Sequence, residues 1–282
     1  MYANRLLESR SDITTTDTKT PLVVSYDNNP TANTEFYMST LKSHGWNSVF
    51  IGKGEEWRGF IARIRAYAKT LETIDDSQIV VVTDARDVIC IRDSEAFMEG
   101  FREFKRGIVV SMELMCGGNF EVSDDYKNVQ CVPLTRYWKA RGLMPPMRKF
   151  VNAGLVAGSV KALKQMYAWI LENGFTDDQY AIGSYMNTFP DRVAADTDAI
   201  LLHTTNFGVN AGIQSIHIQK NDSPTLAELY GRGAFFLHIP GMTGTGQSVI
   251  YETVRNIVSH GVKGQQLSRV YGYKEPAWNE LF

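Results

Sequence analysis

The chain has 282 residues, a net charge of −2 and 44% hydrophobic residues, which is enough for one large α/β domain or two small ones. The balanced charge argues against a uniformly basic nucleic-acid coat, although it leaves room for a local basic patch. The three cysteines cannot all pair with one another and have no CxxC spacing. We therefore expect free thiols in a reducing compartment rather than a structural zinc site.

The first 20 residues are polar and predict a flexible N-terminal arm. Residues 21–282 show no sharp change of composition, so we expect a single domain over this range. The N-terminus lacks an apolar secretory region, and no stretch approaches the roughly 18 apolar residues of a membrane span. The sequence thus predicts a soluble, cytoplasmic protein without a membrane partner.

Helical and strand-like patterns alternate along the chain, which is typical of an α/β fold. Apolar runs predict strands at residues 21–27, 47–52, 79–82, 108–112, 150–158, 193–196, 200–203 and 235–238. Helical spacing predicts helices at residues 35–44, 57–73, 94–104, 160–171, 176–186 and 249–259. Residues 132–150 are basic, aromatic and broken by two prolines. We interpret them as a solvated loop, with contact to an anionic or sugar-like acceptor as the alternative.

The first expected strand ends in Ser25, Tyr26 and Asp27, directly before a run of turn-forming residues. A strand end of this kind can lie beside a nucleotide, with Tyr26 stacked on a base and Asp27 accepting a base or ribose hydrogen. The alternative is that the three residues simply begin a loop.

The strongest signal for a site follows the uninterrupted β-formers of residues 79–82, a pattern that suits a strand buried on both faces. Asp84 and Asp87 come directly after this strand, three residues apart. Open α/β sheets place their ligands at such strand ends. Two carboxylates there can bind a divalent cation, which in turn can hold a diphosphate. The alternative is that both residues cap a turn or the next helix.

Polar or small residues also follow the later strands. Glu113 is either a further site carboxylate or a cap. The strand at residues 150–158 carries Asn152 and Gly154, and its small residues allow either a ligand or another strand to come close.

Two further candidate segments lie towards the C-terminus. Asp177 and Asp178 fit the first turn of a helix capped by Thr176, where the helix dipole favours acids. His238 ends an apolar strand before a glycine-rich run that includes Gly241 and Gly244. It is a candidate metal ligand beside a phosphate cradle, or else a hydrogen-bonded structural histidine.

Taken together, the order and spacing of these motifs resemble the GT-A glycosyltransferases, and most closely the glycosyltransferase domain of the procollagen lysyl hydroxylases. The similarity runs from about Pro21 to His260. The family's Asp-x-x-Asp, Phe-Leu-x-Ser-Gly-Gly-Phe-Ile-Gly, Asp-Gln and Leu/Ile-His-Gly motifs are matched by residues 84–87, 150–158, 177–179 and, loosely, 237–241. The resemblance implies a GT-A (Rossmann-like) fold, with a mixed, mostly parallel sheet flanked by helices.

By this resemblance, Asp84, Asp87 and His238 would bind Mn²⁺ or Mg²⁺, which would hold the diphosphate of a UDP-sugar. Asp177 and Asp178 would be the catalytic residues, facing the acceptor and the transferred sugar. The other residues expected at the nucleotide sugar are Ser25, Tyr26, Asp27, Arg63, Asn152, Gly154, Gly241 and Gly244, with Asp84 shared between metal and donor.

This chain also departs from the family pattern. Ala153-Gly154-Leu155 replaces Ser-Gly-Gly, and the basic residue expected after the histidine is missing between Gly241 and Val254. Arg63 aligns roughly with a basic helix residue of the family and would supply a phosphate contact instead. The oxygenase domains of the lysyl hydroxylases are absent from the sequence, so we expect no lysine hydroxylation.

The sequence therefore predicts a metal-dependent glycosyltransferase that moves a hexosyl or pentosyl group from a nucleotide sugar to a hydroxyl acceptor. The acceptor would lie on a glycan, a protein side chain or a hydroxymethylated DNA base. One alternative is a metal-dependent phosphohydrolase built on the same aspartates. Another is an inactive module that binds nucleotide sugars or glycans.

Overall fold

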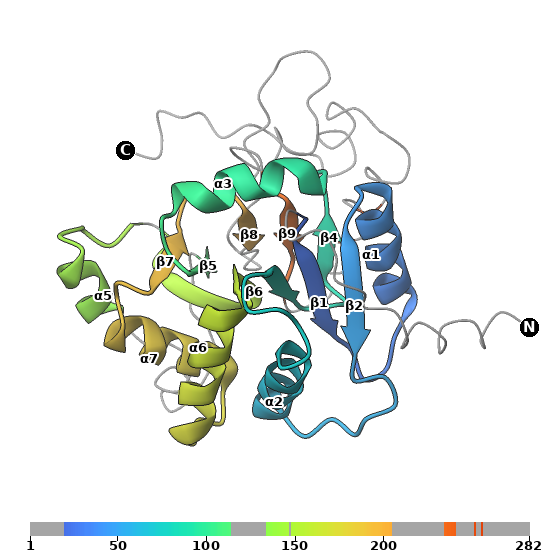
Figure 1. The fold of residues 1–282 in the computed structure, drawn as a ribbon, viewed down its shortest axis with the longest axis horizontal. Helices are drawn as coiled ribbons and strands as arrows, with labels where there is room; N and C mark the ends of the chain where they lie inside the picture. The colour runs from blue at the N-terminus through green and yellow to red at the C-terminus, as the bar shows by residue number, and fades with distance from the viewer. Residues whose placement is uncertain are drawn as a thin grey trace, which may run out of the picture.

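A computed structural model describes residues 20–113, 134–146, 148–204 and 234–240, together with Tyr251 and Arg255. At its centre is a 6-stranded sheet with the order β2-β1-β3-β6-β5-β7 (Figure 1). Its strands are β1 (Leu22–Tyr26), β2 (Asn47–Ile51), β3 (Ile79–Thr83), β5 (Ile108–Glu113), β6 (Phe150–Ser159) and β7 (Val193–Asp196). Strand β6 runs antiparallel to β3 and β5, and the other neighbours are parallel. The mixed, mostly parallel sheet that the sequence predicts is confirmed.

Helices cover both faces of this sheet. The helices are α1 (Ala32–Ser43), α2 (Phe60–Leu71), the short 3₁₀ helix η1 (Ser94–Ala96), α3 (Phe97–Glu103), α5 (Thr135–Ala140), α6 (Val160–Glu172) and α7 (Asp178–Thr188). Helices α2, α5, α6 and α7 share one apolar cluster, and α1 and α3 share the other. In β3, Val80 and Val82 face the first cluster, whereas Ile79 and Val81 face the second. Burial on both faces explains the continuous run of β-formers.

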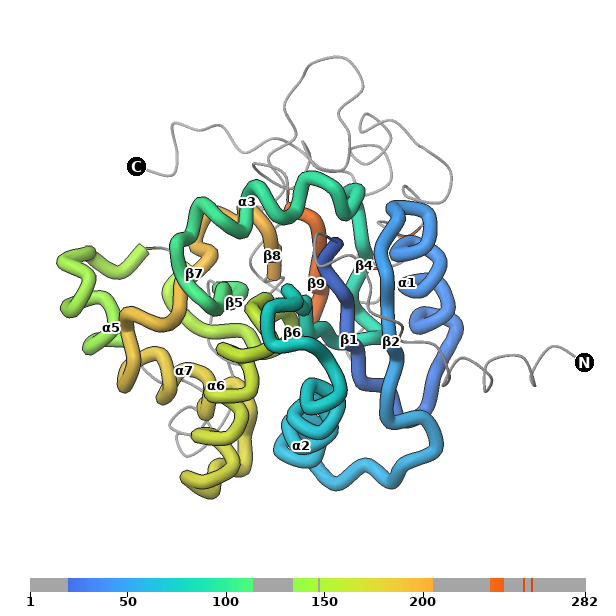
Figure 2. Tube along the Cα trace, viewed as in Figure 1, coloured from blue at the N-terminus to red at the C-terminus, as the bar shows by residue number. Residues whose placement is uncertain are grey.

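A second, 3-stranded sheet lies beside the first and has the order β4-β9-β8. It consists of β4 (Val88–Cys90), β9 (Phe236–His238) and β8 (Leu202–Thr204). Strand β9 pairs antiparallel with β4, and the register sets His238 opposite Val88. Figure 2 shows β9 passing between β4 and β8. This pairing brings the end of β9 next to the loop that follows β3.

Three local expectations were wrong. The segment at residues 132–150 contains helix α5, whose Tyr137 and Trp138 are buried in the core, so it is not simply a solvated loop. The helix expected from residue 57 begins at Phe60, because Gly59 has a φ of 88°, a conformation that suits glycine and not a helix. Helix α7 is capped by Asp177 rather than by Thr176.

Other expectations lie outside the described residues. They are the N-terminal arm up to residue 19, most of the helix at residues 249–259, and two candidate donor-binding glycines, Gly241 and Gly244. The limits of the arm and of the domain remain predictions. None of the helices in the described part of the chain is long and apolar enough to cross a lipid bilayer.

Candidate metal and catalytic site

The loop from Asp84 to Asp87 joins β3 to β4 and is held at both ends by main-chain hydrogen bonds. The N–H of Asp84 donates to the carbonyl of Gly154 in β6 at 2.9 Å. The carbonyl of Asp87 accepts from the N–H of Ile239, just after β9, at 2.8 Å. The two aspartates are therefore fixed next to β6 on one side and β9 on the other.

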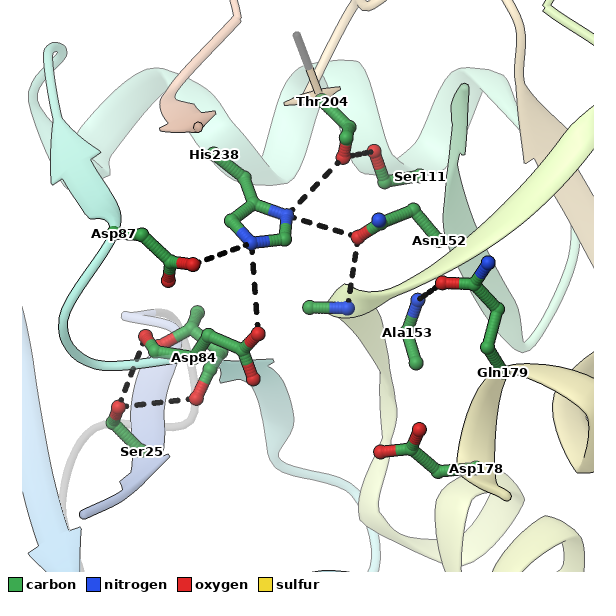
Figure 3. A network of polar contacts seen from close by, with 12 residues as sticks. Ser25, Asp84, Asp87, Ser111, Asn152, Ala153, Asp178, Gln179, Thr204 and His238 are labelled. Atoms are coloured by element: carbon green, nitrogen blue, oxygen red, sulfur yellow. Dashed lines mark hydrogen bonds and ion pairs between the residues drawn. The ribbon is translucent and has the colours of Figure 1, made fainter. Parts of the chain in front are cut away.

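His238 points into the space between these two aspartates (Figure 3). Its Nε2 lies 3.5 Å from Asp84 Oδ2 and 3.4 Å from Asp87 Oδ2. One ligand-capable atom from each of the three residues lies within 4.8 Å of the others. The structure thus brings together the three side chains that the sequence predicted as metal ligands, from segments about 150 residues apart in the chain.

Asn152 determines which nitrogen of His238 faces the aspartates. Its Oδ1 accepts from the N–H of Gly154 at 2.9 Å, and its Nδ2 donates to Glu113 Oε2 at 3.2 Å. The same Oδ1 lies 2.9 Å from His238 Nδ1. Because an amide oxygen only accepts, Nδ1 carries the proton and donates it. Nε2 is then the nitrogen directed at the carboxylates, as in metal sites where an outer hydrogen bond orients the histidine.

Gly154 makes room for the histidine ring. A Cβ at this position would lie 2.2 Å from His238 Cε1 and 2.9 Å from Asp84 Oδ2. A side chain would therefore collide with two of the three candidate ligands. Two carboxylates and one oriented imidazole form a donor set that suits a divalent cation such as Mn²⁺ or Mg²⁺. The residues present fit the metal that the resemblance implies.

The electrostatics of the site are dominated by crowded acidic groups. Burial raises the pKa of Asp84, and the positive charge of Arg63 opposes this shift. Burial lowers the pKa of the His238 ring, but the charges of Asp87 and Asp84 outweigh it, and the net effect is a raised pKa. A site whose carboxylates face one another in this way is stabilised by a cation.

Arg63 is a buried residue of α2 that joins the metal candidates to the start of α7. Its Nη1 forms an ion pair with Asp84 Oδ1, and its Nη2 forms another with Asp178 Oδ2. Its Nε also donates to Asp178 Oδ2, at 3.2 Å. The sequence suggested Arg63 as a phosphate contact but gave no sign that it is buried between two carboxylates.

The acidic start of α7 has two different aspartates. Asp177 is the N-cap, and its Oδ1 accepts from the N–H of Tyr180 at 2.7 Å. Asp178 is buried in the first helical turn and is held by Arg63. The next residue, Gln179, donates from Nε2 to Glu113 Oε1 at 2.9 Å.

Glu113 therefore links two parts of the site, because its carboxylate accepts from both Asn152 and Gln179. The sequence left its role open between a site carboxylate and a cap. Its place at the end of an apolar strand was the only signal available. The structure gives it a supporting role, since it orients the amide that in turn orients His238.

The residues expected near the nucleotide lie at the end of β1, beside the aspartate loop. Ser25 Oγ donates to the carbonyl of Thr83 at 3.0 Å and to that of Asp84 at 3.2 Å. The ring of Tyr26 lies 6.2 Å from that of Trp57, centroid to centroid, and 45% of Trp57 is exposed. Asp27 is buried, and Arg86 pairs with its carboxylate.

The chain resembles known proteins at the level of family and, remotely, of solved structures. The model of a family described as the PLOD GT domain matches residues 17–197. A search of curated proteins found no match. A glycosyltransferase involved in the glycosylation of the major capsid of PBCV-1 is 12% identical, with a TM-score of 0.49 over 83% of this chain and 99% of that chain.

A second solved structure, 4-diphosphocytidyl-2C-methyl-D-erythritol synthase from Anaerococcus prevotii DSM 20548, is also 12% identical. Its TM-score is 0.38, over 64% of this chain and 89% of that chain. Neither similarity reaches a TM-score of 0.5. The family match is different in kind, because residues 17–197 are most of the chain and include both aspartate pairs. The chain therefore belongs to the PLOD GT domain family and is a glycosyltransferase, as the motifs in its sequence predict.

Proposed function

We propose that this glycosyltransferase depends on a divalent metal and transfers a sugar from a UDP-linked donor to a hydroxyl group. The observation that carries the proposal is the convergence of Asp84, Asp87 and His238, with His238 Nε2 turned towards both carboxylates by Asn152. These three side chains would hold Mn²⁺ or Mg²⁺. When bound, the cation would offset the negative charge of the departing nucleoside diphosphate.

The donor would lie along the edge formed by the end of β1 and the aspartate loop. Ser25 and Tyr26 would border the nucleoside, and Arg63, which pairs with Asp84, would meet the diphosphate. Asn152 and Gly154 would contribute in two ways. They would lie near the donor, and they also position His238, which Asn152 orients and for which Gly154 makes room. Gly241 and Gly244 remain proposed donor contacts.

The acceptor side would be the start of α7. A carboxylate there can accept the proton of the attacking hydroxyl or stabilise positive charge on the sugar carbon. Asp178 would take this role, because Arg63 joins it to Asp84 and so holds it beside the candidate metal ligands. Asp177 would act beside it, with its cap bond fixing the first turn of the helix.

The acceptor hydroxyl would belong to a glycan, a protein side chain or a hydroxymethylated DNA base. The segment at residues 132–150 could contact an anionic acceptor through its basic side chains, since Arg136, Lys139 and Lys149 are exposed. Two of its aromatic residues, Tyr137 and Trp138, are buried and cannot stack on an acceptor.

A panel of nucleotide sugars with Mn²⁺ tests the proposal, with donor hydrolysis and the thermal shift as readouts. We expect UDP-linked donors to be hydrolysed and to raise the melting temperature only when the metal is present. Calorimetry of UDP with Mn²⁺ should show binding to the natural protein and none to Asp87→Ala. Lys164→Ala is the control. It removes an ion pair with Asp76, which lies in the turn before β3, at the opposite end of β3 from the loop that carries Asp84 and Asp87.

Other outcomes would favour the alternatives. Release of phosphate from a phosphorylated substrate, without thermal protection by UDP, would indicate a phosphohydrolase. Binding of UDP and Mn²⁺ without transfer or donor hydrolysis would indicate an inactive binding module. Unchanged binding of UDP and Mn²⁺ by Asp87→Ala would remove the metal site from the proposal.

A further inference from the structure

Arg86 lies between the two candidate metal ligands of its loop but reaches towards a different part of the molecule. Its Nε and Nη2 donate to Asp27 Oδ1, at 3.1 and 2.6 Å. Its Nη2 also donates to Asn28 Oδ1 at 3.3 Å and to the carbonyl of Asn29 at 3.1 Å. One guanidinium therefore fixes three consecutive residues of the turn between β1 and α1.

Asp27 is fully engaged within the protein. Its side chain is 1% exposed. Besides the two bonds from Arg86, Oδ1 accepts from the N–H of Asn29 at 3.0 Å, and Oδ2 accepts from the hydroxyl of Thr34 at 2.5 Å. A buried carboxylate needs such donors, and charge-assisted bonds of this kind are the strong ones. A nucleotide could bond to Asp27 only if the residues that cover its buried carboxylate moved aside.

We infer that Arg86 is a positioning residue that ties the metal-binding loop to the end of β1, and that Asp27 serves this contact instead of recognising the nucleotide. The inference rests on the proposed function, since it concerns the loop that would hold the metal. Two main-chain bonds already fix the ends of that loop, at Asp84 and Asp87. Arg86 fixes its middle from the opposite side.

The order of the residues in the loop lets it make contacts on two sides. Asp84 and Asp87 turn towards His238, and the residue just before Asp87 turns away from it towards Asp27. A planar guanidinium that bonds several acceptors at once restricts the loop more than a single charge would. Groups that hold metal ligands in place typically contribute about 10- to 100-fold to metal affinity.

Titration of Mn²⁺ into the nucleotide-free protein tests the inference. We expect Arg86→Ala to weaken Mn²⁺ binding about 10-fold, and Arg86→Lys to recover only part of that loss, because an ammonium lacks the planar fork that bonds Asp27 through both Nε and Nη2. Asp27→Asn keeps the shape of the side chain but removes its charge, so it should weaken Mn²⁺ binding in the same direction. Combining it with Arg86→Ala should add little, because both changes break one contact.

Two results from the binding measurements would overturn the inference. One is unchanged Mn²⁺ affinity in Arg86→Ala, measured beside the control Lys164→Ala. The other is an Asp27→Asn protein that binds Mn²⁺ normally but binds UDP more weakly, which would return Asp27 to nucleotide recognition.

Amide hydrogen exchange in the metal-free protein separates this inference from the proposed function. Arg86→Ala should speed exchange in residues 84–90, whereas Lys164→Ala should not. If the natural protein bound no Mn²⁺, the proposed metal site would be wrong. The exchange data would still decide whether Arg86 holds the loop. Unchanged exchange in residues 84–90 of both Arg86→Ala and Arg86→Lys would exclude that role.

Discussion

The two aspartate pairs of this domain lie in neighbouring parts of the site but are stabilised in different ways. Asp84 and Asp87 follow a central strand and converge on a histidine from a distant segment. Asp177 and Asp178 begin a helix, where one caps the helix and the other pairs with Arg63. The first pair concentrates negative charge that a cation would offset. The second is already balanced by local bonds and by one arginine.

Arg63 connects these two regions, since it pairs with Asp84 and with Asp178. A diphosphate that attracted this guanidinium would therefore change the charge balance of both pairs at once. Under the proposed function, the same residue type would bind a metal in one region and would face a proton or a sugar in the other. The following changes test that difference, beginning with the one expected to have the largest effect.

Arg63→Ala should break the link between the two regions. It leaves Asp84 and Asp178 without their shared cation, and loss of one partner of a buried pair costs about 3 kcal/mol. Urea unfolding measures this loss. Mn²⁺ should restore part of the stability by binding the folded state beside Asp84, and it should do nothing for Asp178.

The matched variant is Arg63→Lys, which can pair with one carboxylate but cannot bridge two with a planar fork. Its stability should lie between those of the natural protein and Arg63→Ala. If Arg63→Ala were as stable as Lys164→Ala, the guanidinium would not be needed between the two aspartates.

Gly154→Ala should disturb only the first region, which consists of Asp84, Asp87 and His238. The new Cβ would lie 2.6 Å from His238 Nδ1, so the ring or strand β6 must move. Overpacking of this kind costs about 1–3 kcal/mol, and the displaced ligand should lower Mn²⁺ affinity by about 100-fold. Calorimetry with Mn²⁺ and UDP measures the loss.

Gly174→Ala is the control for the glycine change itself, because Gly174 has open space around it and a φ of 69°. It should cost stability without affecting the metal. Normal Mn²⁺ binding by a folded Gly154→Ala protein would show that His238 is not a ligand in the position seen here.

Glu113→Ala should weaken Mn²⁺ binding about 10-fold, because it releases the Nδ2 of Asn152 and so loosens the orientation of His238. Glu113→Gln should have a smaller effect. The new amide can still accept from Asn152 if Gln179 turns over, and that turn gives up only a long 3.4 Å bond from the N–H of Ala153. Equal losses in the two variants would mean that the charge of Glu113, rather than its hydrogen bonds, supports the site.

The sequence singled out the three side chains that converge, Asp84, Asp87 and His238, because the signals for them are local. The run of β-formers before Asp84 marks a strand buried on both faces, and His238 ends another apolar strand. Strand ends are where α/β sheets gather their site residues. The pairing of β4 with β9 that joins them was not predicted, because β4 is only 3 residues long and directly follows the loop.

The supporting contacts could not be predicted from the sequence. Arg63 lies among other basic residues of α2, and only the packing of α2 near α7 shows that two carboxylates surround it. The chain from Glu113 through Asn152 to His238 crosses three strands, whose order no local pattern contains. Helix α5 was missed because its buried aromatic residues stand in a basic segment followed by two prolines.

Substitutions of Asp177 should have the smallest effect on stability, and they test the second region, Asp177 and Asp178, directly. Asp177→Ala removes the acceptor for the N–H of Tyr180 and should cost about 1 kcal/mol of stability. Asp177→Asn keeps an oxygen at the cap, so its stability should stay within a few tenths of a kcal/mol of the natural protein.

Activity then separates capping from catalysis, because an amide cannot accept the acceptor's proton. If Asp177→Asn keeps its activity, Asp177 serves the helix and the chemistry rests on Asp178. A loss of roughly 100-fold or more in a stable Asp177→Asn protein would instead make Asp177 a proton acceptor in its own right, and the two aspartates of α7 would then work as a pair, as we propose for Asp84 and Asp87.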